Sequence, residues 1–253
     1  HEPENWLVVK HNPYICGQCI WTGADFLGEA FGWPIRVAQP GLLDTAGFEK
    51  PLFDLRKALW TDALTAKLAV YSMDEFCNAS TIWAGREGET KDVPVLTNGE
   101  TATLSLNGVV LDTKAVDETC MTVFHVAYKP GELSVTCGRG GETVTDTLVT
   151  PGKAASIAAK NASEPGDEMQ QIEVSLTDKN GRIAATDDRQ LSCAVSGAGE
   201  FMGIENGCAS DLTSYASDTR PTYRGRAIVY IRVTGRAKAR LSAPGLPPVT
   251  VEL

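Results

Sequence analysis

Residues 92–112, DVPVLTNGETATLSLNGVVLD, carry the pattern that decides the fold of this 253-residue chain. Asp92 to Leu96 and Thr101 to Leu106 are short runs in which apolar residues recur at the period of a half-buried strand. Asn107-Gly108 supplies the positive φ angles of a tight turn, so Val109 to Asp112 can pair back as a hairpin. This stretch predicts antiparallel sheet.

The same pattern extends along most of the chain and forms two sets of strands. The first set is predicted at Ala66 to Met73, Asp92 to Leu96, Thr101 to Leu106, Val109 to Asp112, Thr122 to Ala127, Glu132 to Cys137 and Glu142 to Val149. The second set follows Thr150-Pro151-Gly152, at Ala154 to Ala159, Gln170 to Thr177, Gln190 to Ser196, Gly199 to Ile204, Arg226 to Val233, Ala237 to Ala243 and Val249 to Leu253. Such spacing is typical of immunoglobulin-like β-sandwiches. We therefore expect a mainly β chain with two sandwich domains, at 61–150 and 151–253.

Residues 1–60 differ in character from the rest. Glu4 to Lys10 is predicted to end a helix, and Tyr14 to Trp21 to form a buried strand. A long loop, Gly23 to Phe48, precedes a helix predicted over Lys50 to Trp60. Helix, buried strand, long loop and helix form the ending of a (β/α)8 barrel, whose active site lies on the face of that loop. Most other strands and helices of such a barrel are absent, so this part is expected to be a barrel remnant.

Composition excludes several partners. The net charge of −9 and the pI near 4.9 argue against nucleic acid, which needs a surplus of Lys and Arg. The basic run Arg232 to Arg240 alternates like the solvent face of strands around a glycine turn, the alternative being a polyanion site. No apolar stretch has the length of a membrane span, and no signal peptide is recognised, so the sequence leaves cytoplasm and periplasm open as compartments. A start at His1 without Met suggests that an upstream segment was removed.

Cysteine usage favours free thiols over disulfides or metal sites. The seven cysteines are an odd number, and most stand singly along predicted strands. Cys16 and Cys19 form a C-x-x-C motif, but residues three apart on a strand point to opposite faces, and no second ligand pair has a zinc-like spacing. Buried free thiols suit a reducing compartment somewhat better than an oxidising one.

Residues 15–29, ICGQCIWTGADFLGE, resemble the last barrel strand of glycoside hydrolase family 2, the group of β-galactosidases and β-glucuronidases. In that family the strand ends in a Trp followed four residues later by an Asp, matched here by Trp21 and Asp25. The loop WPIR…GLLDTAGFEK, beginning at Trp33, is also similar to the loop of these enzymes.

Turn sequences of both predicted sandwiches extend the resemblance in family order. VPVLTNGE and LSLNG in the first sandwich, with AYKPGEL from Ala127, resemble a hairpin and turn of the domain that follows the barrel. DKNGR from Asp178, GAGEFMGIENG from Gly197 and YRGR from Tyr223 resemble turns of the C-terminal module. Each motif is weak alone, but the ordered set runs nearly from end to end of the chain.

The resemblance implies which parts of the active site this chain carries. The two catalytic glutamates of the family end barrel strands four and seven, upstream of Ile15, so no catalytic residue is expected here. Substrate-binding roles are expected for Trp21, whose ring would face the sugar, and for Asp25 and Glu29. The alternatives are a core position for Trp21 and structural support for Asp25. Pairing within the rim loop is favoured for Glu29, Arg36, Asp44 and Lys50.

Two hypotheses about function follow. The first is a C-terminal fragment of a retaining exo-β-glycosidase, expected to be a β-galactosidase, that carries part of the sugar-pocket wall and is inactive alone. The second is a non-catalytic β-sandwich module for carbohydrate binding or scaffolding. The expected partners are a terminal β-galactoside or related glycan and the N-terminal part of the same enzyme, with no cofactor, metal, nucleic acid or membrane. The sequence leaves the sugar and a homo-oligomeric state of the parent enzyme open.

Overall fold

The computed structural model describes residues 2–71 and 79–253 of the chain. The chain divides into two compact units. The first comprises His1–Gly23, Pro40–Leu43 and Glu49–Thr150, and the second comprises Ala24–Gln39, Asp44–Phe48 and Pro151–Leu253. Residues 1–60 therefore contribute to both units. Among the described residues, no helix combines the length and hydropathy of a membrane span.

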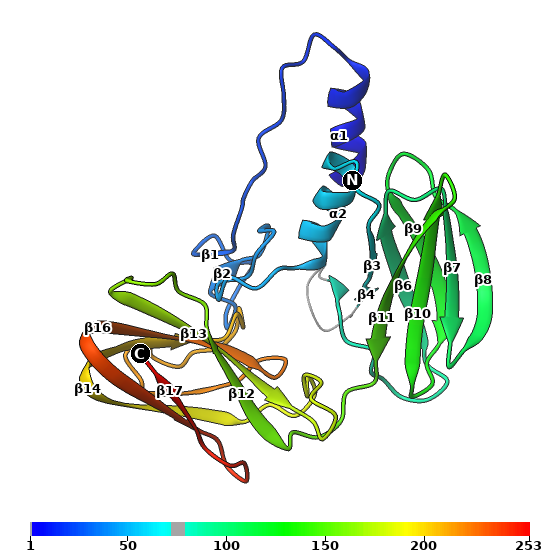
Figure 1. Ribbon diagram of the computed structural model, residues 1–253. Coiled ribbons are helices and arrows are strands. Elements are labelled where there is room, and N and C mark those ends of the chain that lie inside the picture. Colours follow the sequence, from blue (N-terminus) through cyan, green and yellow to red (C-terminus); the bar gives the residue numbers. More distant parts are fainter. Residues whose placement is uncertain (1, 72–78) are drawn as a thin grey trace. The chain divides into compact units, whose positions relative to one another are not determined.

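Both predicted helices are confirmed in the first unit (Figure 1). The helix α1 spans Glu2–His11 and ends before Pro13, which cannot continue a helix. The helix α2 spans Pro51–Trp60, with the proline in the first turn, where its missing N–H costs no hydrogen bond. The rings of Trp6 and Trp60 meet edge to face at 5.9 Å, so an aromatic contact joins the two helices.

The predicted buried strand Tyr14 to Trp21 is wrong. No residue from 14 to 21 has strand conformation, and Cys16, Cys19 and Trp21 are exposed. An apolar strand becomes regular only when neighbouring strands take up its backbone N–H and C=O groups. Among the described residues no strand runs beside this segment, so its apolar pattern has no sheet to join.

The first sandwich consists of two antiparallel sheets and a short strand pair (Figure 1). One sheet has the order β11-β10-β7-β8. Its strands are β7 Thr101–Leu106, β8 Val109–Ala115, β10 Glu132–Arg139 and β11 Glu142–Val149. The other has the order β3-β6-β9, from β3 Ala66–Leu68, β6 Thr90–Thr97 and β9 Met121–Ala127. The predicted strand Ala66 to Met73 divides into β3 and β4 Val70–Tyr71, which pairs with β5 Ala79–Ser80; residues 72 and 73 lie outside the described part.

The core of the first sandwich lies between these sheets. It includes Leu104, Leu133, Val135 and Trp83, all fully buried. The indole N–H of Trp83 donates to the Lys129 carbonyl at 3.1 Å, which satisfies the one polar atom of that ring. Alternate residues of β7 and β10 fill this core, as the period-two pattern predicts.

The turn residue Asn98 connects the first sandwich to the end of α2. Its side-chain N–H groups donate to the carbonyls of Thr61 and Ala63 at 2.9 and 2.8 Å, and its Oδ1 accepts the Thr65 N–H at 2.9 Å. Asn98 thus satisfies three backbone groups of the segment between α2 and β3.

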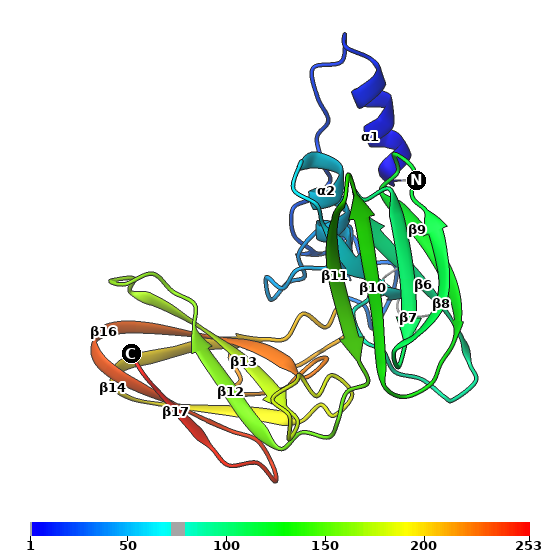
Figure 2. The ribbon, with the colours of Figure 1, turned by 45° about the vertical axis from the view of Figure 1, so that its right-hand side comes forward.

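The second sandwich is built on two long strands, β14 Gln190–Glu205 and β16 Arg226–Ser242 (Figure 2). The remaining strands are β12 Ser156–Asn161, β13 Met169–Thr177, β15 Thr219–Pro221 and β17 Val249–Glu252. Strand β16 pairs with β13 over its first half and with β17 over its second half, while β14 pairs with it along both. Each long strand therefore joins two strands predicted separately.

Bulges make it possible for β14 to stay paired with β16 over this length. The register shifts between Gly197 and Gly199, and again between Phe201 and Gly203. At the second shift Met202 of β14 has no partner, and such a one-residue bulge increases the local bend. At the first shift residue 198 of β14 lies opposite residues 234–236 of β16. The core on the inner face includes Ile172, Leu191, Val229, Ile231 and Leu241, all fully buried.

The described cysteines are all free thiols. Cys137 and Cys193 are buried in the first and second cores, and burial raises the pKa of both, that of Cys193 to about 11. Cys77 lies outside the described residues.

Each sandwich has a core of its own, so a cavity in one core should destabilise that sandwich. Leu104→Ala is expected to lower the unfolding free energy of the first sandwich, and Leu241→Ala that of the second, each by about 2–5 kcal/mol. Amide hydrogen exchange, resolved by strand, measures both in one experiment. Equal loss of protection in both sandwiches for either variant would contradict separate cores.

The turn at Gly131 predicts a second stability effect. Gly131 has φ of 133°, and an added Cβ would lie 1.8 Å from Oδ1 of Asn107, which accepts the Glu132 N–H at 2.8 Å. Gly131→Ala should therefore cost more than the roughly 1 kcal/mol of an unfavourable φ alone. Gly140→Ala is the matched control, since Gly140 has φ of 59° and open space around its Cβ position. Urea unfolding should rank Gly131→Ala clearly below Gly140→Ala; the reverse order would show that Asn107 does not restrict this turn.

Candidate functional site

Asp44 organises the loop that precedes α2. Its Oδ1 accepts the N–H groups of Ala46 and Phe48, both at 2.9 Å, and its own N–H donates to the Phe48 carbonyl at 2.9 Å. Gly47 has φ of 83°, which closes this tight turn. The Asp44 carboxyl thereby fixes the direction in which Phe48 leaves the loop.

This turn packs against the second sandwich, within the second unit. Ala46 and Phe48 form an apolar cluster with Ile228 of β16, and the Arg226 guanidinium lies 3.5 Å from the centre of the Phe48 ring. A Cβ at Gly207, whose φ is 78°, would lie 2.3 Å from Oδ2 of Asp44, so any larger residue there would displace the Asp44 carboxylate.

Arg36 holds the preceding part of the same loop against residues 209–215 of the second sandwich. The short strands β1 Phe26–Leu27 and β2 Val37–Ala38 pair antiparallel and close the loop. The backbone N–H of Arg36 donates to the Ala209 carbonyl at 2.9 Å, and the Arg36 guanidinium donates to the Asp211 carbonyl. The same guanidinium lies 5.6 Å from the centre of the Tyr215 ring.

The buried Arg220 holds Asp211 and Tyr215, the two residues that Arg36 contacts. Arg220 is 1% exposed and pairs with the Asp211 carboxylate at 3.0 Å while donating to the Thr213 carbonyl at 2.9 Å. Its guanidinium lies 4.7 Å from the Tyr215 ring centre. A buried charge is stable only when it is paired and hydrogen-bonded, and Arg220 meets both conditions.

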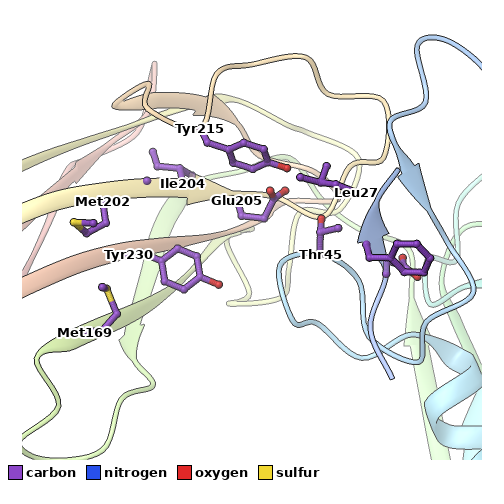
Figure 3. Close-up of a pocket in the computed structure, with 11 residues that line it drawn as sticks. Leu27, Thr45, Met169, Met202, Ile204, Glu205, Tyr215 and Tyr230 are labelled. Carbon is purple, nitrogen blue, oxygen red and sulfur yellow. The ribbon is translucent and has the colours of Figure 1, made fainter. Parts of the chain in front are cut away.

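A cavity of about 520 Å³ lies in the second unit, between the loop and the outer face of β14 and β16 (Figure 3). Its lining residues are Asp25, Phe26, Leu27, Thr45, Met169, Met202, Gly203, Ile204, Glu205, Tyr215 and Tyr230. The walls are mainly apolar, with two carboxylates and three hydroxyls, and the lining contains no Lys, Arg or His. The volume falls in the range of small-molecule sites.

The bulge in β14 shapes this cavity. Phe201 pairs with Ile231 and Gly203 with Tyr230, so Met202 is the extra residue of the bulge and has no partner on β16. Since Ile231 and Val229 face the core, Tyr230 between them faces outward beside Gly203. Gly203 brings no side chain, which leaves the face open at this point.

Glu205 is the most buried carboxylate of the lining. It is 7% exposed, and its Oε1 accepts the N–H groups of Asn206 and Gly207 at 2.8 and 3.0 Å. Arg220 lies 3.8 Å from the same oxygen. Burial, together with the negative charge of Glu205, raises the pKa of Tyr215 and of Tyr230, so both phenols keep their protons at neutral pH.

One hydroxyl group of the lining lacks a partner among the described residues. Oγ1 of Thr45 is buried without a hydrogen bond, and the half-buried Tyr230 lines the same cavity. A buried polar group that stays unsatisfied costs about 1–3 kcal/mol.

The residues predicted to bind substrate differ in their placement. Trp21 is 72% exposed in the first unit, and its peptide bond to Thr22 is cis. Asp25 is 8% exposed and lines the cavity of the second unit. Glu29 is exposed, with φ of 49°, and is not part of that lining. A core position for Trp21 is therefore not seen in this chain, and substrate contact by the three residues stays a prediction.

The rim-loop residues for which pairing was favoured have separate roles. Arg36 and Asp44 hold the loop to the second sandwich, as described above. The Lys50 N–H donates to the Leu42 carbonyl at 2.9 Å in the first unit. Sequence reasoning missed Glu205, Tyr215 and Tyr230; the available signal was the ENG turn, whose Gly207 is required by the approach of Asp44.

Comparisons with known families match both sandwiches. The model of glycoside hydrolase family 2 C-terminal domain 5 matches residues 155–252, and a domain of unknown function, DUF4982, matches residues 88–145. Among curated relatives, β-galactosidase BoGH2A of Bacteroides ovatus is 27% identical over 253 residues, covering 96% of this chain and 28% of the relative. A putative β-glucuronidase of Formosa agariphila is 25% identical and covers 92% of this chain and 23% of the relative. The chain thus spans about a quarter of the length of these relatives.

Solved structures of family 2 proteins have a fold similar to that of this chain. A β-glycosidase from Bacteroides vulgatus is 26% identical, with a TM-score of 0.85, over 99% of this chain and 32% of that protein. A glycosyl hydrolase family 2 member from Bacteroides cellulosilyticus, 24% identical, has the same fold, with a TM-score of 0.92 over 99% of this chain and 37% of that protein. Residues 155–252 match the C-terminal domain 5 of glycoside hydrolase family 2, and the chain as a whole is similar to the C-terminal portion of enzymes of that family.

Proposed function

We propose that this chain is the C-terminal part of a retaining exo-β-glycosidase that removes terminal β-galactosides. The observation that carries the proposal is the segment Trp21-Thr22-Gly23-Ala24-Asp25, with its resemblance to the end of the last barrel strand in this family. The similarity to a relative named β-galactosidase, over 96% of this chain, supports the choice of substrate.

In this proposal the catalytic carboxylates come from other parts of the enzyme. A retaining glycosidase needs two carboxyl groups about 5–5.5 Å apart, one as nucleophile and one as acid and base. The most buried candidate here, Glu205, uses Oε1 to hold the N–H groups of Asn206 and Gly207. That role suits a structural carboxylate better than a nucleophile, which must approach the anomeric carbon.

The chain contributes the wall of the sugar pocket and a support for its rim. Trp21 would offer an aromatic face to the apolar C–H side of a pyranose. The loop from Ala24 to Phe48 follows the position of the last barrel strand, on the side where barrel enzymes bind substrate. Contacts of Arg36 and Asp44 with the second sandwich would keep that loop in one conformation.

Reconstitution tests the assignment of the chemistry. The chain alone is expected to leave a chromogenic β-galactoside unhydrolysed, because it lacks the catalytic pair, and mixing with the N-terminal part of the enzyme should restore hydrolysis. Release of the chromophore measures both. Turnover by the purified chain alone would refute the assignment, and would direct attention to Asp25 and Glu205.

The role of Trp21 can be measured in the reconstituted enzyme. Trp21→Ala should weaken transition-state binding by about 0.5–1.5 kcal/mol, a two- to tenfold loss of kcat/KM, because the sugar loses an aromatic face. Trp33→Ala is the matched control, since Trp33 is similarly exposed, at 79% against 72% for Trp21, and has no proposed sugar contact. Equal effects of the two substitutions on kcat/KM would argue against a specific role for Trp21.

A further inference from the structure

The cavity on the outer face of the second sandwich has unused hydrogen-bonding capacity. Among the described residues Thr45 Oγ1 has no hydrogen-bond partner, and Tyr230 presents its hydroxyl at the same cavity. Both belong to the same lining, and Figure 3 shows Glu205 between Tyr215 and Tyr230. A ligand with several hydroxyl groups could satisfy these atoms together.

Glu205 adds an acceptor to these two hydroxyls. A carboxylate offers about four acceptor positions. Three bonds to Glu205 are present, from the N–H groups of Asn206 and Gly207 and from the Tyr215 hydroxyl. Acceptor capacity therefore remains for a ligand hydroxyl, and Asp25 supplies a second carboxylate at the lining.

The apolar side of the lining selects among hydroxylated ligands. Met169 and Met202 lie on the side of the cavity away from Thr45 (Figure 3), and Ile204, Leu27 and Phe26 complete the apolar surface. Thioether side chains adapt to irregular apolar surfaces. A pyranose ring presents an apolar C–H face and a rim of hydroxyls, and so matches both kinds of wall.

Charge restricts the ligand further. Asp25 and Glu205 are the ionisable acids of the lining, and no cationic side chain lines it. The carboxylate of a uronic acid would enter a cavity without a positive partner, and burying an unpaired charge is costly. A neutral sugar carries no such penalty.

We infer that this cavity binds a neutral pyranose unit of a glycan, with Thr45, Glu205 and Tyr230 bonded to its hydroxyls and Met169 and Met202 against its apolar face. The inference takes its ligand class from the proposed glycosidase function. It adds residues of the second sandwich to the sugar contact predicted for Asp25, and it prefers a neutral sugar over a uronic acid.

The four methionines of the chain offer a direct binding measurement. In the 253-residue chain with ¹³C-labelled methionine methyl groups, titration with methyl β-D-galactopyranoside should shift the Met169 and Met202 signals with saturation. Met121, in β9 of the first sandwich, serves as the internal control and should not move. Methyl β-D-glucuronide at the same concentrations should produce a much smaller shift.

Two substitutions identify the hydroxyl contacts. Thr45→Val removes a buried hydroxyl that bonds to none of the described residues, and Tyr230→Phe removes the hydroxyl of a half-buried ring while keeping the ring, so neither should lower the unfolding free energy appreciably. Each should weaken galactoside binding by about two- to tenfold, the value of one hydrogen bond. Tyr71→Phe, at an exposed tyrosine of the first sandwich, is the matched control and should leave the dissociation constant unchanged.

Three results would overturn the inference. They are no saturable shift of Met169 and Met202 with the galactoside, binding of the glucuronide that equals or exceeds it, or unchanged affinity in both Tyr230→Phe and Thr45→Val. None of these depends on hydrolysis, so failure here is distinguishable from failure of the reconstitution assay.

Discussion

The pairing of β14 with β16 is the constraint on which the second sandwich depends. The two strands stay in register from Ser192 with Ser242 to Glu205 with Ile228, interrupted only by two shifts. Because side chains alternate across a strand, a slip of one residue would turn Val229 and Ile231 out of the core and Tyr230 into it. One register therefore sets both the core and the outer cavity. The bulge at Met202 departs from that register at the point where the cavity lies, in keeping with the use of bulges to redirect side chains near binding sites.

Much of the fold could be predicted because its signals are local. The strand pattern of β7 and the Asn107-Gly108 turn lie within a few residues of each other, and the proline of α2 marks its own first turn. The prediction failed where a structure depends on distant partners. Tyr14 to Trp21 has the composition of a buried strand, but no neighbouring strand is present among the described residues to pair with it. Strand β14 was predicted as two strands, Gln190 to Ser196 and Gly199 to Ile204, whereas its pairing with β16 continues through both register shifts.

The candidate site was predictable only in part, for a similar reason. Asp25 was found through a motif of adjacent residues, and it does line the cavity. Met169, Glu205 and Tyr230 come from three strands far apart in the sequence, and only the pairing of β13, β16 and β14 brings them together. The sequence spacing of these three residues does not predict that they lie together. Arg36 and Asp44 show the opposite case, since their presence in a rim loop was noted while their partners in the second sandwich could not be read from the sequence.

The attachment of the Ala24–Gln39 and Asp44–Phe48 segments to the last sandwich bears on how this sandwich can be exchanged between related proteins. A recombination boundary at the Thr150-Pro151 linker looks natural in the sequence, yet it would separate Asp44 from Gly207 and Phe48 from Arg226. The second unit is discontinuous in sequence. It contains two short loop segments and a sandwich that begins more than a hundred residues after them. A chimera that exchanges only the contiguous last hundred residues would combine the loop of one protein with the sandwich of another, so their contact residues would not match. Grafting the loop segments together with the sandwich keeps Asp44 with Gly207 and Phe48 with Arg226, so a piece that is joined in space keeps contacts that a piece joined only in sequence would lose.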